Sequence, residues 1–183
     1  TTLGTTTTDG SGNWTYTLTP TDQSTIGQGT GKTVSATATD AAGNSSTSTT
    51  SPAFAIDTVA PPAAGTVTGI SADTGTPGDF VTNVASQTVS GSFSGTLGAG
   101  EKFQVSANGT TWVDATAGTG TWSAAGVVLS PGTGVLMVRT IDAASNTTLG
   151  TGHAYTLDTV LPPAVATVTA LSADTGTPGD FVT

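Results

Sequence analysis

Hydrophobic and polar residues alternate along short runs of this chain. In Asn13–Thr19, Trp14, Tyr16 and Leu18 alternate with polar residues, and Lys32–Thr39 alternates through valine and alanine. Such period-two runs, rich in β-branched residues, are typical of strands with one buried face. Similar runs occupy Gly65–Ile70, Gln87–Ser94, Lys102–Ser106, Gly120–Ser123 continuing to Leu129, Val135–Ile141 and Ala154–Leu157. No stretch keeps a helical period, so the pattern predicts an all-β fold.

A long internal repeat sets the domain organisation. DTVAPPAAGTVTGISADTGTPGDFVT begins at Asp57, and DTVLPPAVATVTALSADTGTPGDFVT begins 101 residues later at Asp158. A period of about 100 residues with roughly seven strands predicts immunoglobulin-like β-sandwich repeats arranged end to end. We therefore expect the C-terminal part of one domain at 1–56, a complete domain at 57–157 and the N-terminal part of the next at 158–183. We interpret the chain as an internal fragment of a longer array of such domains.

Composition excludes several classes of function. The chain has 3 basic and 12 acidic residues, which argues against binding to nucleic acid or to an anionic membrane surface. No run is long and apolar enough to insert into a bilayer. Cysteine is absent, which removes disulfides and thiol catalysis. No hydrolase, phosphate-loop or zinc-protease motif occurs, so we do not expect an enzyme.

The motifs together carry a resemblance. With DTVAPP, SADTGTPGDFVT, GSGNWTYTLT, ATATDAAGN and VRTIDAASN in this order, the chain resembles the tandem bacterial Ig-like repeats of giant secreted adhesins, the RTX and biofilm-associated surface proteins. The similarity covers essentially the whole chain. It implies an extracellular location at the bacterial cell surface and a stalk that projects an adhesive tip. It also implies calcium at the domain junctions.

Acidic residues at the predicted domain ends lead to the same metal. Consecutive strands of a sandwich run in opposite directions, so the Ser71–Asn83 loop should face the next domain and the Asp142–Gly150 connection the previous one. Four carboxylates meeting at a junction repel one another, and a hard cation with oxygen ligands, calcium above all, relieves that repulsion. The candidate ligands are Asp57, Asp73, Asp79, Asn83, Asp142, Asn146 and Asp158, with their equivalents Asp174, Asp180, Asp40 and Asn44. The alternative is turn chemistry, because Asp and Asn side chains bond to nearby backbone.

Two other functions stay open at this stage. The incomplete end domains suggest a self-assembling filament in which neighbouring copies complete each other by strand exchange. Tryptophan in Gly-rich loops suggests a glycan-binding module, although Trp14 and Trp122 occupy matching positions and are expected in the core. The position of Trp112, at the surface or in the core, is left undecided. We expect neighbouring repeats or other copies of the chain as partners, and we do not expect glycan binding.

Overall fold

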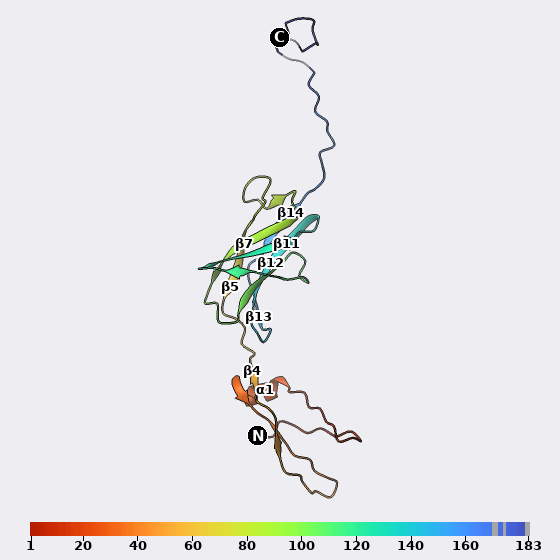
Figure 1. Ribbon diagram of the computed structural model, residues 1–183, viewed down its shortest axis with the longest axis vertical. Coiled ribbons are helices and arrows are strands. Elements are labelled where there is room, and N and C mark those ends of the chain that lie inside the picture. Colours follow the sequence, from red (N-terminus) through yellow and green to blue (C-terminus); the bar gives the residue numbers. More distant parts are fainter. Residues whose placement is uncertain (170–171, 174, 182–183) are drawn as a thin grey trace.

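The computed structural model describes residues 1–169, 172–173 and 175–181. The described part is mostly β, with several sheets, as an all-β sandwich requires. In Figure 1 a sheet-rich central unit lies between an N-terminal segment and an extended C-terminal segment. The strands of the central unit are β5 (Ala64–Ile70), β6 (Val81–Thr82), β7 (Ser86–Ser94), β8 (Lys102–Ser106), β9 (Val113–Asp114), β10 (Thr116–Ala117), β11 (Thr121–Val128), β12 (Gly132–Ile141), β13 (Thr147–Leu149) and β14 (His153–Leu157).

The central unit is built from two sheets. One has the order β10-β11-β7-β5 and is antiparallel throughout. The other has the order β6-β14-β12-β8-β9, and β13 pairs with β12 beside this path. Its only parallel pair among the described strands joins β6 to β14. The six strands predicted in this unit are confirmed to within three residues at each end.

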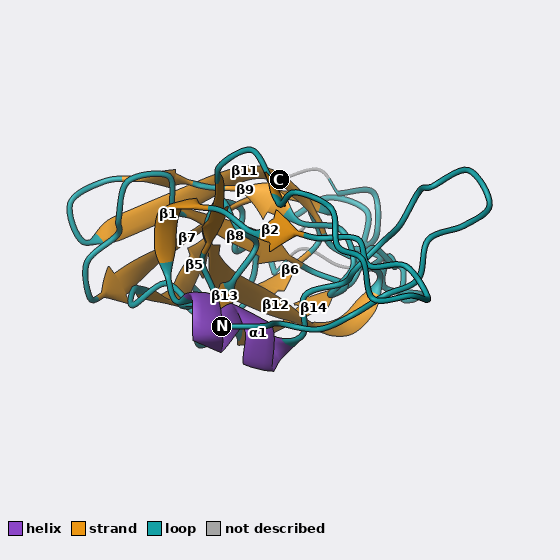
Figure 2. Ribbon diagram, turned by 90° about the horizontal axis from the view of Figure 1, so that it is seen from below, coloured by secondary structure: helices purple, strands orange, loops and turns teal. Residues whose placement is uncertain are grey.

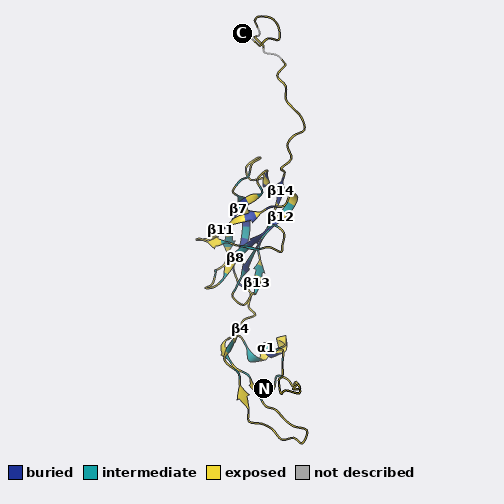
Figure 3. Cartoon of the chain, turned by 45° about the vertical axis from the view of Figure 1, so that its right-hand side comes forward, coloured by how far each residue is buried: buried dark blue, intermediate teal, exposed yellow. Residues whose placement is uncertain are grey.

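The core lies between the two sheets. Phe103, Val89 and Leu136 are fully buried, and Trp122 is 2% exposed. The Trp122 indole packs over its cross-strand partner Gly91 and donates a hydrogen bond to the Ser92 carbonyl oxygen at 2.9 Å. Burial of each such large apolar side chain stabilises the domain by about 1.5–3 kcal/mol. Figure 3 shows that the buried residues concentrate in this central unit.

The N-terminal segment differs from its predicted strands. It contains four short strands, and the Asn13–Thr19 run forms no strand. Within Lys32–Thr39 only two residues form a strand, and a separate strand ends at Lys32. The four strands are β1 (Gly29–Lys32), β2 (Ser35–Ala36), β3 (Thr49–Thr50) and β4 (Phe54–Ile56), paired as β1-β4 and β2-β3. A sheet of only two strands buries little surface. An alternating sequence of apolar and polar residues is therefore not enough to make its strands longer.

A short helix, α1 (Pro20–Ile26), is a second correction, because no helix was expected. It is drawn in purple in Figure 2. Thr19 and Asp22 form a capping box, in which the Asp22 N–H donates to Thr19 Oγ1 at 3.2 Å and the Thr19 N–H donates to Asp22 Oδ2 at 2.9 Å. Proline at the first helical position favours this start. Seven residues are too few to produce a helical hydrophobic period.

The prediction that Trp14 lies in a core is wrong. Its side chain is 51% exposed, whereas the matching Trp122 is buried. Trp122 is covered by β5, β7 and β8, and residues 1–56 contain no counterpart of these strands. The same residue at the same sequence position therefore has a different environment in the two units.

Candidate functional site

The acidic loop Ser71–Asn83 is anchored at its base by a buried amide. Gln87 is 1% exposed, and its Oε1 accepts hydrogen bonds from Ser71 Oγ at 3.1 Å and from the Ala72 N–H at 2.9 Å. Its Nε2 donates to the Val84 carbonyl oxygen at 2.7 Å. Gln87 thus links the beginning of the loop to β7, the strand in which Gln87 itself lies. The sequence predicted only that Gln87 begins a strand, and not that it anchors the loop.

The end of the same loop is fixed by Phe80. This residue has a left-handed φ of 59° although it is not glycine, and its side chain is buried. The ring stacks on His153 with 3.7 Å between centroids, and the Phe80 carbonyl oxygen accepts from the Thr156 N–H at 3.0 Å. Packing against β14 therefore holds a backbone conformation that a side chain normally disfavours.

The two carboxylates of the loop have different surroundings. Asp73 Oδ2 accepts from the Gly78 N–H at 2.7 Å, while Asp73 Oδ1 is buried without a hydrogen-bond partner. Asp79 Oδ1 accepts from the Val81 N–H at 2.8 Å, and its residue is exposed. An unpaired buried carboxylate oxygen is unfavourable unless a further donor or a cation reaches it.

The loop and the outgoing linker lie at the same end of the sandwich. β6, which closes the loop, pairs in parallel with β14, and the Asp158 N–H donates to the Thr82 carbonyl oxygen at 2.9 Å. Asp158 begins an Asx turn, with its Oδ1 accepting from the Val160 N–H at 2.9 Å. The structure therefore brings the Asp73/Asp79 loop and the linker aspartate to one end. Asn83 belongs to the same loop, and its N–H donates to Thr74 Oγ1 at 2.9 Å.

The opposite end carries the Asp142–Asn146 turn and the incoming linker. Asp142 Oδ1 accepts from the Asn146 N–H at 2.8 Å, and Asp142 Oδ2 accepts from Asn146 Nδ2 at 2.8 Å. Asn146 Nδ2 also donates to the Asp57 carbonyl oxygen at 3.1 Å. The turn is thus in direct contact with the linker, and β13, which follows the turn, lies toward the N-terminal segment in Figure 1.

The same turn occurs three times in the described chain. Asp40 bonds to Asn44 as Asp142 does to Asn146, and Asp9 bonds to Asn13 in the same pattern, which the sequence reasoning overlooked. The spacing Asp-x-x-x-Asn was the available signal. Hydrogen bonds from Asn146 and Asn44 hold the pKa values of Asp142 and Asp40 below the ordinary range. The carboxylates of these aspartates are therefore already hydrogen-bonded within their own turns.

The fit to a hard cation rests on the Ser71–Asn83 end. Asp73 offers a buried unpaired oxygen, and Asp79 and Asp158 add carboxylates at the same end; such oxygens are the ligands that calcium prefers. Across the described residues no three acidic or histidine side chains gather closely enough to hold a metal ion. The set present is compatible with calcium but calls for oxygens from elsewhere to complete a shell.

The second copy of the loop repeats the local geometry at its described residues. The Asp180 N–H donates to the Thr177 carbonyl oxygen at 3.1 Å, as Asp79 does to Thr76 at 3.2 Å. Phe181 has a φ of 60°, close to the 59° of Phe80. Asp174, the predicted counterpart of Asp73, lies outside the described residues. The turn is consequently encoded by its own residues, since 158–181 carry no described strand.

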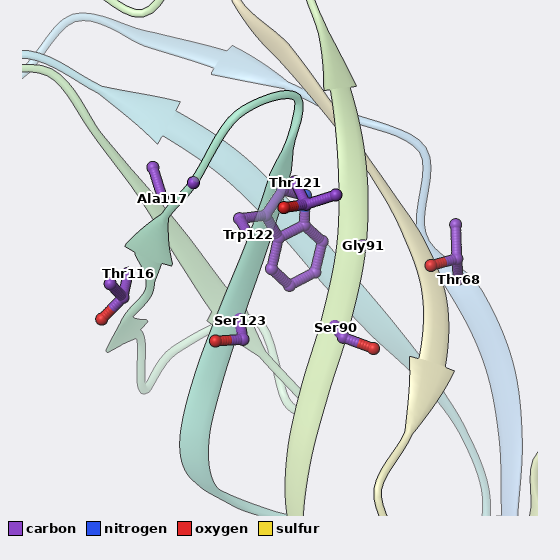
Figure 4. Close-up of a pocket in the computed structure, with 9 residues that line it drawn as sticks. Thr68, Ser90, Gly91, Thr116, Ala117, Thr121, Trp122 and Ser123 are labelled. Atoms are coloured by element: carbon purple, nitrogen blue, oxygen red, sulfur yellow. The ribbon is translucent and has the colours of Figure 1, made fainter.

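The tryptophans and a surface groove bear on ligand binding. Arg139 lies over the Trp112 ring at 4.0 Å and donates to Gln104 Oε1, so one face of this half-buried indole is already covered. A shallow groove of about 490 Å³ crosses the sheet of β5, β7, β10 and β11. It is shown in Figure 4 and is lined by small, hydroxyl-bearing and glycine residues around Trp122, none of them charged.

No family model matches the chain, and no curated protein matches it. Within the described residues, no helix has the length and apolar character needed to span a membrane.

Proposed function

We propose that this chain is a segment of a non-enzymatic, extracellular stalk, built from immunoglobulin-like repeats joined end to end and belonging to a bacterial surface adhesin. The observation that carries the proposal is the repeat of 101 residues that begins at Asp57 and again at Asp158. The two linkers leave the central sandwich at opposite ends, so successive copies of this unit extend along one line (Figure 1).

The strand order supports an immunoglobulin-like topology. The sheet β10-β11-β7-β5 corresponds to a D-E-B-A arrangement, and β14-β12-β8-β9 corresponds to G-F-C-C′. A first strand divided between the two sheets, here β5 and β6, matches such a domain. The buried Trp122 does not occupy the usual strand C position, so the likeness concerns topology and not the core signature.

Calcium is proposed as the ion that stiffens each junction. Asp73, Asp79 and Asp158 would hold it from one domain, and an Asp142-type turn of the following domain would complete the shell. The unpaired Asp73 Oδ1 supports this assignment, because it is an oxygen that the protein alone leaves unsatisfied. Affinities of extracellular modules of this kind are about 10⁻⁴–10⁻³ M.

Small-angle X-ray scattering on three full repeats, with calcium and then with EDTA, tests the stalk and its metal together. We expect the maximum dimension to shrink and the profile to become flexible in EDTA. Asp73→Asn in every repeat should abolish the calcium response, while Asp114→Asn, which removes the ion pair with Lys102, should preserve it. A rod of equal length under both conditions would refute the calcium part, and a compact particle would refute the stalk.

A self-assembling filament is the second candidate, favoured by one observation. The N-terminal segment has only two-stranded pairs and exposes Trp14, an arrangement that strands from another copy would cover. Light scattering of the purified chain over a range of concentrations decides this case. Growth of fibres, together with protection of Trp14 fluorescence from a soluble quencher, would support the filament. A monomer at all concentrations would exclude the filament.

A further inference from the structure

The linker Asp57–Ala63 is held by side chains from both of the units that it joins. On the side of the central sandwich, Asn146 Nδ2 donates to the Asp57 carbonyl oxygen at 3.1 Å, and Thr140 Oγ1 donates to the Ala63 carbonyl oxygen at 2.6 Å. Thr148 Oγ1 bonds to Pro61 in the same way. These bonds satisfy linker carbonyls that a flexible connection would leave to water.

On the other side, Gln28 binds the linker through both ends of its amide. The Thr58 N–H donates to Gln28 Oε1 at 3.0 Å, and Gln28 Nε2 donates to Thr58 Oγ1 at 2.5 Å. Thr58 is the neighbour of Asp57, so adjacent linker residues are bound from opposite sides. A two-point contact fixes the direction of the backbone as well as its position.

The equivalent contact is missing at the next linker. Gly29 of β1 pairs with Ile56, and Gly132 of β12 pairs with Leu157, so the two glycines occupy equivalent positions before the two linkers. The residue that precedes Gly29 is Gln28, and the residue that precedes Gly132 is Pro131. Proline offers no amide to Thr159, and no hydrogen bond to Thr159 is found among the described residues.

We infer that Gln28 is a positioning residue that locks the linker at Thr58 without a metal ion, and that Pro131 leaves the linker at Thr159 without this lock. The junctions of this chain thus come in two kinds, one fixed by hydrogen bonds and one that relies on other means. The biological meaning of this difference rests on the proposed stalk, in which the two kinds of junction set where the stalk is stiff and where it bends.

Amide hydrogen exchange of the full 183-residue chain, followed by NMR in EDTA, tests the lock residue by residue. In the unmodified chain, the Thr58 amide should exchange about fivefold more slowly than that of Thr159, after correction for sequence effects, because one net hydrogen bond protects it. Gln28→Ala should raise the Thr58 rate to that of Thr159. The control Gln23→Ala, on α1, should leave Thr58 unchanged.

A converse variant keeps the proposal falsifiable if Gln28→Ala disturbs the N-terminal segment. Pro131→Gln should slow exchange at Thr159 by about fivefold. An unchanged Thr58 rate in Gln28→Ala would overturn the lock. An equal acceleration in Gln23→Ala would also overturn it, since it would indicate general loosening. Failure of Pro131→Gln to slow Thr159 would overturn the assignment of the difference to this position.

Distance measurements separate this proposal from the calcium stalk. The chain has no cysteine, so spin labels at Ser24→Cys and Ser123→Cys report the arrangement of the two units without interference. In EDTA, Gln28→Ala should broaden the distance distribution. An unchanged width would overturn the lock even if calcium still stiffened longer arrays. Broadening by Gln28→Ala would uphold the lock whatever calcium does, because residues 1–56 contain no Asp73-type loop and the metal is tested separately on full repeats.

Discussion

The Phe80 ring lies nearly parallel to the His153 imidazole, with ring centroids 3.7 Å apart and an interplanar angle of 17°. The contact joins the acidic loop to the last strand of the sandwich. Phe181, in the identical sequence of the second copy, has nearly the same φ but is 42% exposed. One chain therefore presents the same residue with and without its packing partner.

This pair gives a matched test of packing. Phe80→Ala should lower the free energy of unfolding of the central domain by about 3–5 kcal/mol, because it empties a buried aromatic site. Phe181→Ala should change it by less than about 0.5 kcal/mol, as exposed substitutions do. Urea denaturation followed by Trp122 fluorescence measures both. Equal effects of the two substitutions would contradict the burial of Phe80.

Ser145 gives a prediction of increased stability. It has a φ of 71°, whereas the equivalent positions of the other two Asp-x-x-x-Asn turns are Gly12 and Gly43. Left-handed backbone costs a non-glycine residue about 1–2 kcal/mol, partly offset by the extra entropy that glycine loses on folding. Ser145→Gly should therefore stabilise the domain by about 0.5–1 kcal/mol. Ser145→Ala keeps the strain, and a gain of stability in that variant would argue against this explanation.

Gly91 is predicted to tolerate no side chain. A Cβ atom there would overlap the Thr66 carbonyl oxygen and the Trp122 ring, both held in the core. Gly91→Ala should destabilise the domain by about 1–3 kcal/mol through overpacking. Gly118→Ala is the control, because the nearest atom to its added Cβ is the Thr121 hydroxyl oxygen at 3.2 Å. Thermal unfolding of the two variants side by side checks the difference.

Acid sensitivity follows from the turn aspartates. Hydrogen bonds from Asn146 lower the pKa of Asp142 from its ordinary 3.8, so the charged form is favoured in the folded state. This contribution is present above the unfolded pKa and is lost as the pH falls through the lowered folded-state value. Asp142→Asn should therefore destabilise most at neutral pH and progressively less as the pH falls below 3.8. Urea midpoints across this range measure it, and a difference independent of pH would exclude a role for the charge.

Sequence reasoning succeeded where a segment has one buried face. Lys102–Ser106 was located without error because Phe103 and Val105 are buried while Lys102 and Gln104, which alternate with them, are more exposed. Strands of two or three residues, such as β6 and β9, are too short to produce an alternating pattern. The capping pair Thr19 and Asp22 did mark the start of α1, but a helix of one or two turns leaves no hydrophobic period to draw attention to it.

Only the outline of the candidate site could be predicted from the sequence. Alternating strand directions placed Asp73 and Asp142 at opposite ends, because consecutive strands of an antiparallel sandwich reverse direction. The bonds of Asn146 to Asp142 and Asp57, and of Gln28 to Thr58, depend on how close two segments approach after folding. No local pattern encodes such distances. Trp14 was misplaced for the same reason, since its exposure depends on strands remote in sequence.

The turn at Thr177–Phe181 keeps the shape of the one at Thr76–Phe80, although the described residues that follow Leu157 form no strand. A segment that already has its final geometry loses less conformational freedom when the rest of its domain assembles. In the central domain this turn lies between β5 and β7, which pair with each other in the finished sheet. The turn thus shortens the flexible part of the chain that must close to bring these strands together. The acidic repeat thereby also lowers the entropy cost of pairing the first strands of the sandwich.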